Sequence, residues 1–257
     1  MTVLAIGDVV GPTGREFLKD RLPGIKRQMA VDLCIVNGEN SGPNNGIDIE
    51  SAEDLYMAGA DVITTGNHVW QRREVYDFLD ENPYIIRPAN YPPGCPGKGY
   101  TIVDCKRDKV LVINLLGTAF LEPLESPFLV VDRILKEVRD EAKFCIVDMH
   151  AEATSEKQAM GFYLDGRASA LFGTHTHVQT ADEQILPKGL GYISDVGMTG
   201  PTLSVLGLDP EMVLKKFTTA MPQRFSISKN PVQMCAVLFE MDEASGKTIK
   251  IQRLAIR

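Results

Sequence analysis

Short apolar runs recur along the chain and are separated by segments rich in Gly, Asn, Asp and Pro. The clearest runs, rich in Val, Ile and Leu, occupy residues 3–7, 32–36, 61–64, 110–116, 144–149, 190–194, 234–240 and 249–256, with a weaker one at 170–172. Runs of this length bounded by turn residues are typical of buried strands. The pattern therefore predicts a protein with many short, buried strands.

Helical patterns lie between these runs. The clearest spans residues 126–142, where Ser126 can cap the helix, Pro127 suits its first turn and the later apolar residues form one stripe. A second helix opens at Asp209-Pro210-Glu211 by the same chemistry. Strand and helix alternate through the first two thirds, which predicts parallel βαβ units. The last runs, near 190, 234 and 249, follow one another with less helix and predict an antiparallel portion.

Composition favours one large folded unit. The chain has 257 residues, 44% of them hydrophobic and evenly spread, so it can bury a sizeable core. We expect a single α/β domain over residues 1–257. Two segments dense in Gly, Pro and Asn, residues 41–48 and 87–99, are expected to be irregular surface loops. In the second, Arg87, Tyr91 and Lys98 are either charge and stacking groups beside a site or ordinary loop residues.

Charge and cysteine usage exclude several classes of protein. A net charge of -7 disfavours a long groove for the nucleic-acid backbone, whereas a small anionic substrate is compatible if metal ions carry the positive charge. The five cysteines form no CxxC pair, so neither a disulfide framework nor a zinc knuckle is indicated, and a reducing compartment is expected. Cys34 and Cys145 lie in apolar runs and are expected to be small buried hydrophobes.

The beginning of the chain, MTVLAIGDVV, has no basic lead-in, and Asp8 interrupts its apolar run. We therefore expect neither a signal peptide nor an anchor there. No stretch approaches the roughly 20 apolar residues that span a bilayer. These observations predict a cytoplasmic protein without a membrane partner.

All four histidines follow strand-like runs. Carboxylates and amides follow similar runs. The full set is Asp8, Glu39, Asn40, Asn67, His68, His150, His175 and His177. Each is weak evidence alone, because such residues often hydrogen-bond in turns or sit in wet loops. Together they matter, because ligand sites of open α/β sheets assemble at the carboxyl ends of strands. The sequence therefore predicts a metal-dependent enzyme.

The candidate ligands outnumber what one ion needs. His175 and His177 are two apart, so in an extended chain their side chains project to the same side. Oxygen and nitrogen ligands without thiolate indicate Mn, Fe or Zn and do not suit a cysteine-type structural zinc site. Two ions about 3.5–4 Å apart, bridged by a carboxylate and a hydroxide, form the usual phosphoester-hydrolysing centre. Glu39 is the candidate for the bridging carboxylate.

The order of these residues resembles the calcineurin-like metallophosphoesterase superfamily, whose motifs are Asp-x-His, Gly-Asp-x-x-Asp, Gly-Asn-His, His and Gly-His-x-His. The matching segments here are Asp8, Gly38-Glu39-Asn40, Gly66-Asn67-His68, His150 and Gly173-Thr174-His175-Thr176-His177. Within the superfamily, the phrases IGDVVGPTGR, NGENS, TTGNHVW, RPANYP and GTHTHVQTAD resemble the YmdB-like branch of bacterial phosphodiesterases over nearly the whole chain. The resemblance implies a layered α-β-β-α sandwich, a dinuclear site and hydrolysis of small phosphodiesters, with 2′,3′- or 3′,5′-cyclic nucleotides as the expected substrates.

The chain departs from the superfamily pattern at two positions. Val10 stands where Asp-x-His has its imidazole, and Glu39 replaces the aspartate of Gly-Asp. Asn40 is placed to supply the missing ligand. A site richer in oxygen is harder, which favours iron or manganese over zinc.

Carried over by resemblance, the ligands divide between two divalent or mixed-valence transition-metal ions. The first set is Asp8, Glu39, Asn40 and His177. The second set is Glu39, Asn67, His150 and His175. His68 is left free of metal, and its expected role is to contact the phosphoryl group and to protonate or stabilise the departing oxygen while a metal-bridging hydroxide attacks.

Two other functions remain open from the sequence. The same centre would serve a phosphomonoesterase or a nuclease, although the acidic balance disfavours the nuclease. A regulatory protein that binds a nucleotide at a feeble metal site is the alternative from another class. The sequence is also compatible with a homo-oligomer.

Overall fold

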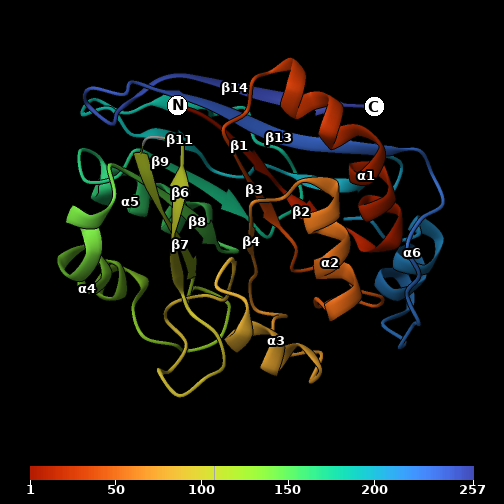
Figure 1. Cartoon of the computed structure of the whole chain (residues 1–257). Helices are drawn as coiled ribbons and strands as arrows, with labels where there is room; N and C mark the ends of the chain where they lie inside the picture. Colours follow the sequence, from red (N-terminus) through yellow and green to blue (C-terminus); the bar gives the residue numbers. More distant parts are fainter. Residues whose placement is uncertain (107) are drawn as a thin grey trace.

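The computed structural model describes residues 1–106 and 108–257 as two β-sheets that pack face to face between helices (Figure 1). The first sheet has the order β2-β12-β13-β1-β3-β4-β5, with β14 paired to β13. Its strands are β1 (Thr2–Ile6), β2 (Asp8–Val9), β3 (Leu33–Asn37), β4 (Val62–Thr64), β5 (Ile85–Ile86), β12 (Met198–Pro201), β13 (Val232–Met241) and β14 (Thr248–Ile256).

The second sheet has the order β10-β11-β9-β8-β7-β6. Its strands are β6 (Tyr100–Cys105), β7 (Asp108–Leu116), β8 (Phe144–His150), β9 (Ala170–Thr174), β10 (Gln184–Ile185) and β11 (Gly191–Ile193). Strands β7, β8, β9 and β11 run parallel, as do β1, β3, β4 and β5 in the first sheet. The carboxyl ends of the central strands of both sheets therefore meet at one edge of the sandwich.

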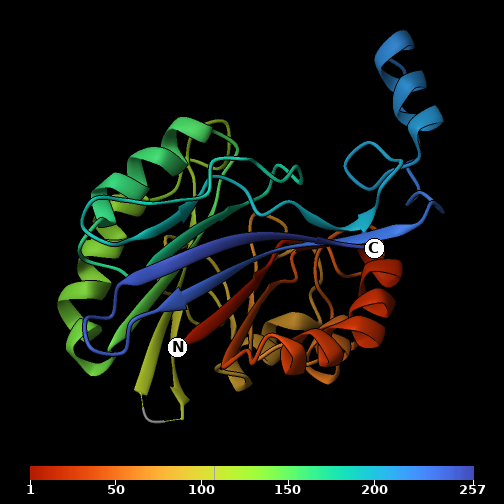
Figure 2. The ribbon, with the colours of Figure 1, turned by 90° about the horizontal axis from the view of Figure 1, so that it is seen from above.

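Helices cover the two outer faces. The first sheet carries α1 (Gly11–Gln28), α2 (Ile49–Ala58) and α3 (Val75–Glu81), and the second carries α4 (Pro127–Val138), a 3-10 turn (Arg139–Glu141) and α5 (Thr154–Leu164). Figure 2 shows α6 (Pro210–Thr219) projecting from the body of the molecule. No helix of the described ranges has the length and apolar character needed to cross a bilayer.

The central strands are apolar throughout because both of their faces are buried. In β1, Val3 and Ala5 face the core between the sheets, whereas Leu4 and Ile6 pack with the helices. Strands buried on both faces have continuous apolar runs without alternation. This arrangement confirms the layered α/β sandwich.

One part of the predicted topology is wrong. Strands β13 and β14 are antiparallel as expected, but β11, in the run near 190, is parallel to β9. The segment between β9 and β11 contains no helix. It is nevertheless long enough, with β10 and its loops, to bring the chain back to the end of the sheet where β9 begins, so β11 can run parallel to β9. The edge strand β6 was not predicted, because it begins directly after the loop at 87–99 and several of its residues are only partly buried.

Helix starts follow the sequence only in part. Asp209 caps α6, and its carboxylate accepts a hydrogen bond from the Glu211 amide at 2.9 Å. Ser126 precedes α4 at the expected place, but its side chain makes no capping hydrogen bond, and the regular helix ends at Val138. Pro127 at the first helical position removes one amide that has no partner within the helix, as Pro210 does in α6.

Both predicted loops, residues 41–48 and 87–99, are irregular. Arg87 is buried and donates hydrogen bonds to the carbonyls of Pro88, Cys95 and Pro96, which ties the second loop to itself. All five cysteines are free, and burial raises the pKa of the Cys34 and Cys145 thiols to about 12.

Candidate functional site

The predicted ligand residues converge at the shared edge of the two sheets. Asp8 follows β1, the Glu39-Asn40 pair follows β3, Asn67 and His68 follow β4, His150 ends β8, and His175 and His177 follow β9. Because parallel strands bring their carboxyl ends together, residues up to 167 positions apart in the chain come within bonding distance, as in the 3.1 Å contact between the His175 amide and Asp8 Oδ2.

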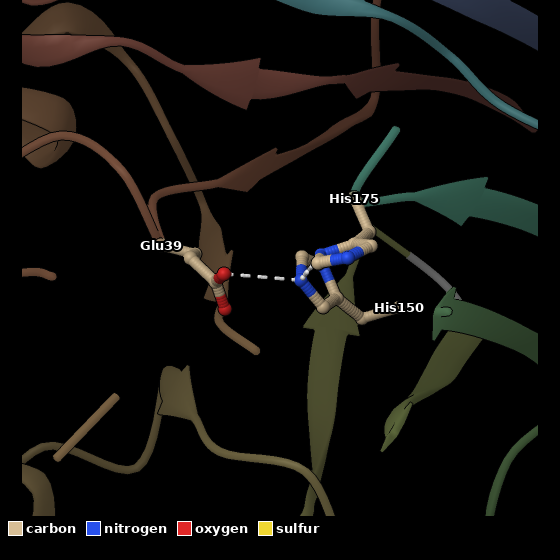
Figure 3. A group of neighbouring side chains, drawn as sticks. All are labelled: Glu39, His150 and His175. Carbon is tan, nitrogen blue, oxygen red and sulfur yellow. Dashed lines mark hydrogen bonds and ion pairs between the residues drawn. The ribbon is translucent and has the colours of Figure 1, made fainter. Parts of the chain in front are cut away.

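The densest part of the cluster is formed by Glu39, His150 and His175, which point toward one another in Figure 3. Nε2 of His150 lies 3.1 Å from Glu39 Oε1, 3.1 Å from Nδ1 of His175 and 3.2 Å from Oδ1 of Asn67. One ligand atom from each of Glu39, His150 and His175 lies within 4.8 Å of the others, so one cation can contact all three. Together with Asn67, these three residues are the set expected for the second ion.

The set expected for the first ion lies beside it. Nε2 of His177 is 3.7 Å from Asp8 Oδ1 and 3.0 Å from Nδ2 of Asn40, while Oδ1 of Asn40 is 3.2 Å from Nδ1 of His68. A half-turn of the Asn40 amide exchanges its two end atoms and would bring the oxygen toward His177. In that orientation the Asn40 oxygen, rather than its amide nitrogen, would lie 3.0 Å from Nε2 of His177.

Two buried carboxylate oxygens in the cluster have no donor other than a histidine. Asp8 and Glu39 are fully buried; Asp8 Oδ1 accepts no hydrogen bond from the described residues, and Glu39 Oε1 faces only His150 Nε2 and His68 Nδ1, each at 3.1 Å. Buried polar atoms are nearly always satisfied, so a buried anionic oxygen without a donor, such as Asp8 Oδ1, is suited to a cation. The donor set fits metal ions on this observation.

His150, His175 and His177, the three inner histidines, each have an acceptor for the ring nitrogen that faces away from the cluster. Nε2 of His175 lies 3.1 Å from Glu152 Oε2, and Nδ1 of His177 lies 3.2 Å from the carbonyl oxygen of Leu206. Histidine ligands usually donate their other N–H to such groups, which fixes the tautomer and leaves the remaining nitrogen for metal.

His150 is held by a longer relay. Its Nδ1 lies 2.8 Å from Thr174 Oγ1, which donates to Asp148 at 2.7 Å, and Asp148 also accepts from Thr64 and Asn37. Burial raises the pKa of Asp148 to about 6, although His150 and the three donors oppose the shift. This relay was not predicted, because Asp148 and Thr174 lie inside strands.

Burial and the neighbouring charges shift the pKa values of His150, Glu39 and His175 in different directions. Burial alone would lower the pKa of His150, but the charges of Glu39, Asp8 and Asp148 outweigh burial and raise it to about 9. Burial would raise the pKa of Glu39, yet His150 and His68 hold it well below its usual range. Burial and His150 lower the pKa of His175 to about 4. A proton on His150 thus balances anionic charge that a bound cation would otherwise balance.

Gly66, in the Gly-Asn-His motif, is required because the side chains of Glu39 and His150 pack directly against its Cα. A Cβ at this position would lie 1.8 Å from Oε2 of Glu39 and 2.3 Å from Cδ2 of His150. Any larger residue would therefore displace two of the proposed ligands.

The loop that carries His175 and His177 has a strained backbone. Both residues have positive φ, 98° and 63°, which non-glycine residues seldom adopt. Between them, Thr176 donates its amide and its hydroxyl to Oδ2 of Asp195, at 3.1 and 2.7 Å. Lys157 donates to the same oxygen at 2.8 Å, and the lysine and aspartate are both almost fully buried. This buried ion pair holds the strained loop in place.

His68 lies at the rim of the cluster. Its Nδ1 is 3.1 Å from Glu39 Oε1 and 3.2 Å from Asn40 Oδ1, so Nε2 is left for a substrate. The contact with Glu39 raises the pKa of His68 against the opposing effect of burial. His68 therefore retains its proton to higher pH than a free imidazole, as a general acid requires.

A cleft of about 630 Å³ opens onto the cluster. Its lining is Val10, Glu39, Asn40, Asn44, Asn45, His68, Glu152, His175, Thr176, His177, Leu206, Leu208, Gln223, Arg224, Phe225, Ser226 and Ile227. Of the three loop residues considered from the sequence, Arg87 and Tyr91 are buried, Lys98 is exposed, and none of them lines this cleft. Most of the lining beyond the cluster was not predicted.

Comparison with solved structures gives the class of protein. A structure from Mycoplasma pneumoniae, described as a novel phosphatase, is 36% identical with a TM-score of 0.93 over 100% of this chain and 93% of that one. The NAD nucleotidase of Haemophilus influenzae, at 12% identity and a TM-score of 0.53 over 99% of this chain and 55% of that one, shares the fold. Fold and site together define a hydrolase of the calcineurin-like metallophosphoesterase class.

Within that class the family is equally clear. The family model described as YmdB-like protein matches residues 4–254, and the chain belongs to this family. A relative from Bacillus subtilis (strain 168) is 46% identical over 256 residues, which cover 100% of this chain and 97% of the relative. That relative is named 2′,3′-cyclic-nucleotide 2′-phosphodiesterase.

Proposed function

We propose that this protein is a phosphodiesterase that hydrolyses 2′,3′-cyclic nucleotides at a centre of two transition-metal ions. The observation that carries the proposal is the pair of buried carboxylates, Asp8 and Glu39, at the histidines: Asp8 Oδ1 has no hydrogen-bond donor among the described residues and lies 3.7 Å from His177 Nε2, and Glu39 Oε1 lies 3.1 Å from His150 Nε2. The name of the Bacillus subtilis relative supports the substrate. Oxygen-rich ligands favour iron or manganese over zinc.

The residues divide into two overlapping ligand sets. Asp8, Glu39, Asn40 and His177 would hold one ion. Glu39, Asn67, His150 and His175 would hold the other. When bound, the ions supply positive charge that polarises the phosphoryl oxygens and lowers the pKa of water at the site.

His68 assists departure of the leaving oxygen. Hydrolysis adds water to phosphorus and breaks the bond to the 2′ oxygen, which would leave as an alkoxide and therefore needs a proton. Nε2 of His68 donates this proton, because Nδ1 is held by Glu39. The proton released by the attacking water balances the transfer, and the product is a nucleoside 3′-phosphate.

The test is turnover by protein purified without chelator, assayed on a 2′,3′-cyclic nucleotide, a 3′,5′-cyclic nucleotide and a phosphomonoester. We expect fastest turnover of the 2′,3′-cyclic substrate to the 3′-phosphate, loss of turnover after metal removal, and recovery with Mn²⁺ or Fe²⁺. Faster turnover of the monoester would identify a phosphomonoesterase. Tight binding of nucleotide by metal-loaded protein without any product would identify a regulatory binder.

A further inference from the structure

The candidate metal residues form only part of the lining of the cleft. Another part, here called the second wall, consists of Leu206, Leu208 and residues 223–227, whose side chains the proposed hydrolysis does not use. Clefts of about 300–1,000 Å³ with apolar walls and a few polar groups are typical of small-molecule sites. A phosphoryl group placed at the histidines therefore leaves most of this space for the rest of its molecule.

The second wall exposes apolar side chains to the cleft. Phe225 is 40% exposed and Leu206 is 47% exposed, and both line the cleft. No aromatic ring of the described residues stacks on Phe225. Gln223 and Arg224 add polar groups at the same wall. An open aromatic face beside polar donors matches a nucleobase, which has a flat π surface and a polar edge.

Backbone hydrogen bonds fix this wall in place. The Asp209 amide donates to the carbonyl of Ser226, and the Ser228 amide donates to the carbonyl of Gly207, both at 2.9 Å. Leu208 and Ile227 form an antiparallel bridge between the two segments. The wall is thus formed before a ligand arrives, which lowers the entropic cost of binding.

Val10 gives a reason for the missing imidazole of the Asp-x-His motif. Its side chain lines the cleft, and a Cβ added at Gly207 would lie 2.7 Å from Cγ1 of Val10. The segment that carries Leu206 therefore packs directly on Val10, where a larger side chain would collide with it. Valine at this position allows the apolar wall to approach the metal residues, and the Leu206 carbonyl accepts from His177 as a result.

We propose that this wall is a nucleobase subsite, in which Phe225 stacks on the base of a nucleotide whose phosphoryl group lies at the histidine cluster. The proposal rests on the proposed function for the position of the phosphoryl group. Stacking tolerates every base, because each has a π face, so the subsite selects nucleotides over small diesters without selecting one base strongly.

The test compares two ligands on metal-loaded protein by calorimetry: a nucleoside 3′-monophosphate and inorganic phosphate. We expect the wild type to bind the nucleotide more tightly than phosphate. Phe225→Ala should weaken the nucleotide by at least about 10-fold, the scale of one stacked base, while phosphate changes less than two-fold. Phe225→Trp should restore nucleotide binding. Phe217→Ala is the matched control, because Phe217 is exposed on α6 outside the cleft.

Equal loss of both ligands in Phe225→Ala, or no loss of the nucleotide, overturns the subsite. So does a wild type that binds the nucleotide no more tightly than phosphate, or that binds neither. This measurement involves no turnover, so it separates the two proposals. A protein that binds the nucleotide through Phe225 but cleaves no phosphodiester would retain the subsite and lose the proposed function.

Discussion

Removal of the Thr176 hydroxyl tests how the strained loop is held. Thr176→Val keeps the shape of the side chain but removes the 2.7 Å hydrogen bond to Asp195. A hydrogen bond to a charged group is worth about 1.5–3 kcal/mol, and each unfavourable φ, at His175 and His177, costs about 1–3 kcal/mol. The lost bond is therefore comparable to the strain that it helps to hold. The amide of Thr176 still donates to Asp195, so we expect a shifted loop in a folded protein.

The expected result is weaker metal binding, because both shifted histidines are proposed ligands. A loss of about 1.5–3 kcal/mol corresponds to roughly 10- to 150-fold in affinity. Competition with a chromophoric chelator measures this affinity without any assay of turnover. Thr176→Ser should rescue it, because serine retains the hydroxyl.

Thr248→Val is the matched control. Thr248, which is buried whereas Thr176 is half-buried, likewise donates a 2.7 Å hydrogen bond, to the Ser169 carbonyl, but it lies on β14 near the opposite end of β9 from the histidines. It should lower the free energy of unfolding by about 0.5–1.5 kcal/mol, since its acceptor is neutral, and leave metal affinity unchanged. If Thr176→Val kept the metal affinity of the wild type, or if the control lost as much, the reasoning would be refuted.

Three further predictions follow from the cluster. Asn40→Ala should weaken one ion selectively, because the other ligand set is untouched; unchanged occupancy of both ions in its crystal structure would contradict the assignment. His68→Ala should keep its metals and lose about 10²–10⁴-fold of its rate on a nucleotide diester, but distinctly less on a nitrophenyl diester, whose leaving group needs no proton; equal losses would indicate a purely electrostatic role, and loss of metal would make His68 a ligand. Metal affinity should rise with pH up to about pH 9 and then level, because the ion must displace the proton of His150, whose pKa is raised to about 9; calorimetry in buffers of different ionisation enthalpy that detects no proton release at pH 7 would argue against this.

The sequence predicted the cluster because its residues carry a visible pattern. Chemistry-bearing side chains at the ends of apolar runs are brought together by parallel strands whatever the details of the loops. His150 and His175 are 25 positions apart and meet because β8 and β9 are neighbours in register. The layered sandwich was predictable for the same reason, since strands with two buried faces have unbroken apolar runs.

The supporting residues were not predictable in this way. Asp148, inside β8, and Asp195, after β11, look like isolated polar residues until the partner strands are placed. Phe225 lies in a segment without regular structure, so no periodicity indicates that it reaches the cleft. The parallel direction of β11 depends on the path of the preceding loop, which local sequence does not determine.

The central claim is that two ions at this cluster support hydrolysis of a phosphodiester. The most direct measurement is a titration in which metal-free protein receives increasing Mn²⁺, and bound metal and turnover of a 2′,3′-cyclic nucleotide are determined on the same samples. We predict that turnover is absent without metal and reaches its maximum at two ions per chain. Full turnover with a single bound ion, or turnover that persists after complete removal of metal, would contradict the account.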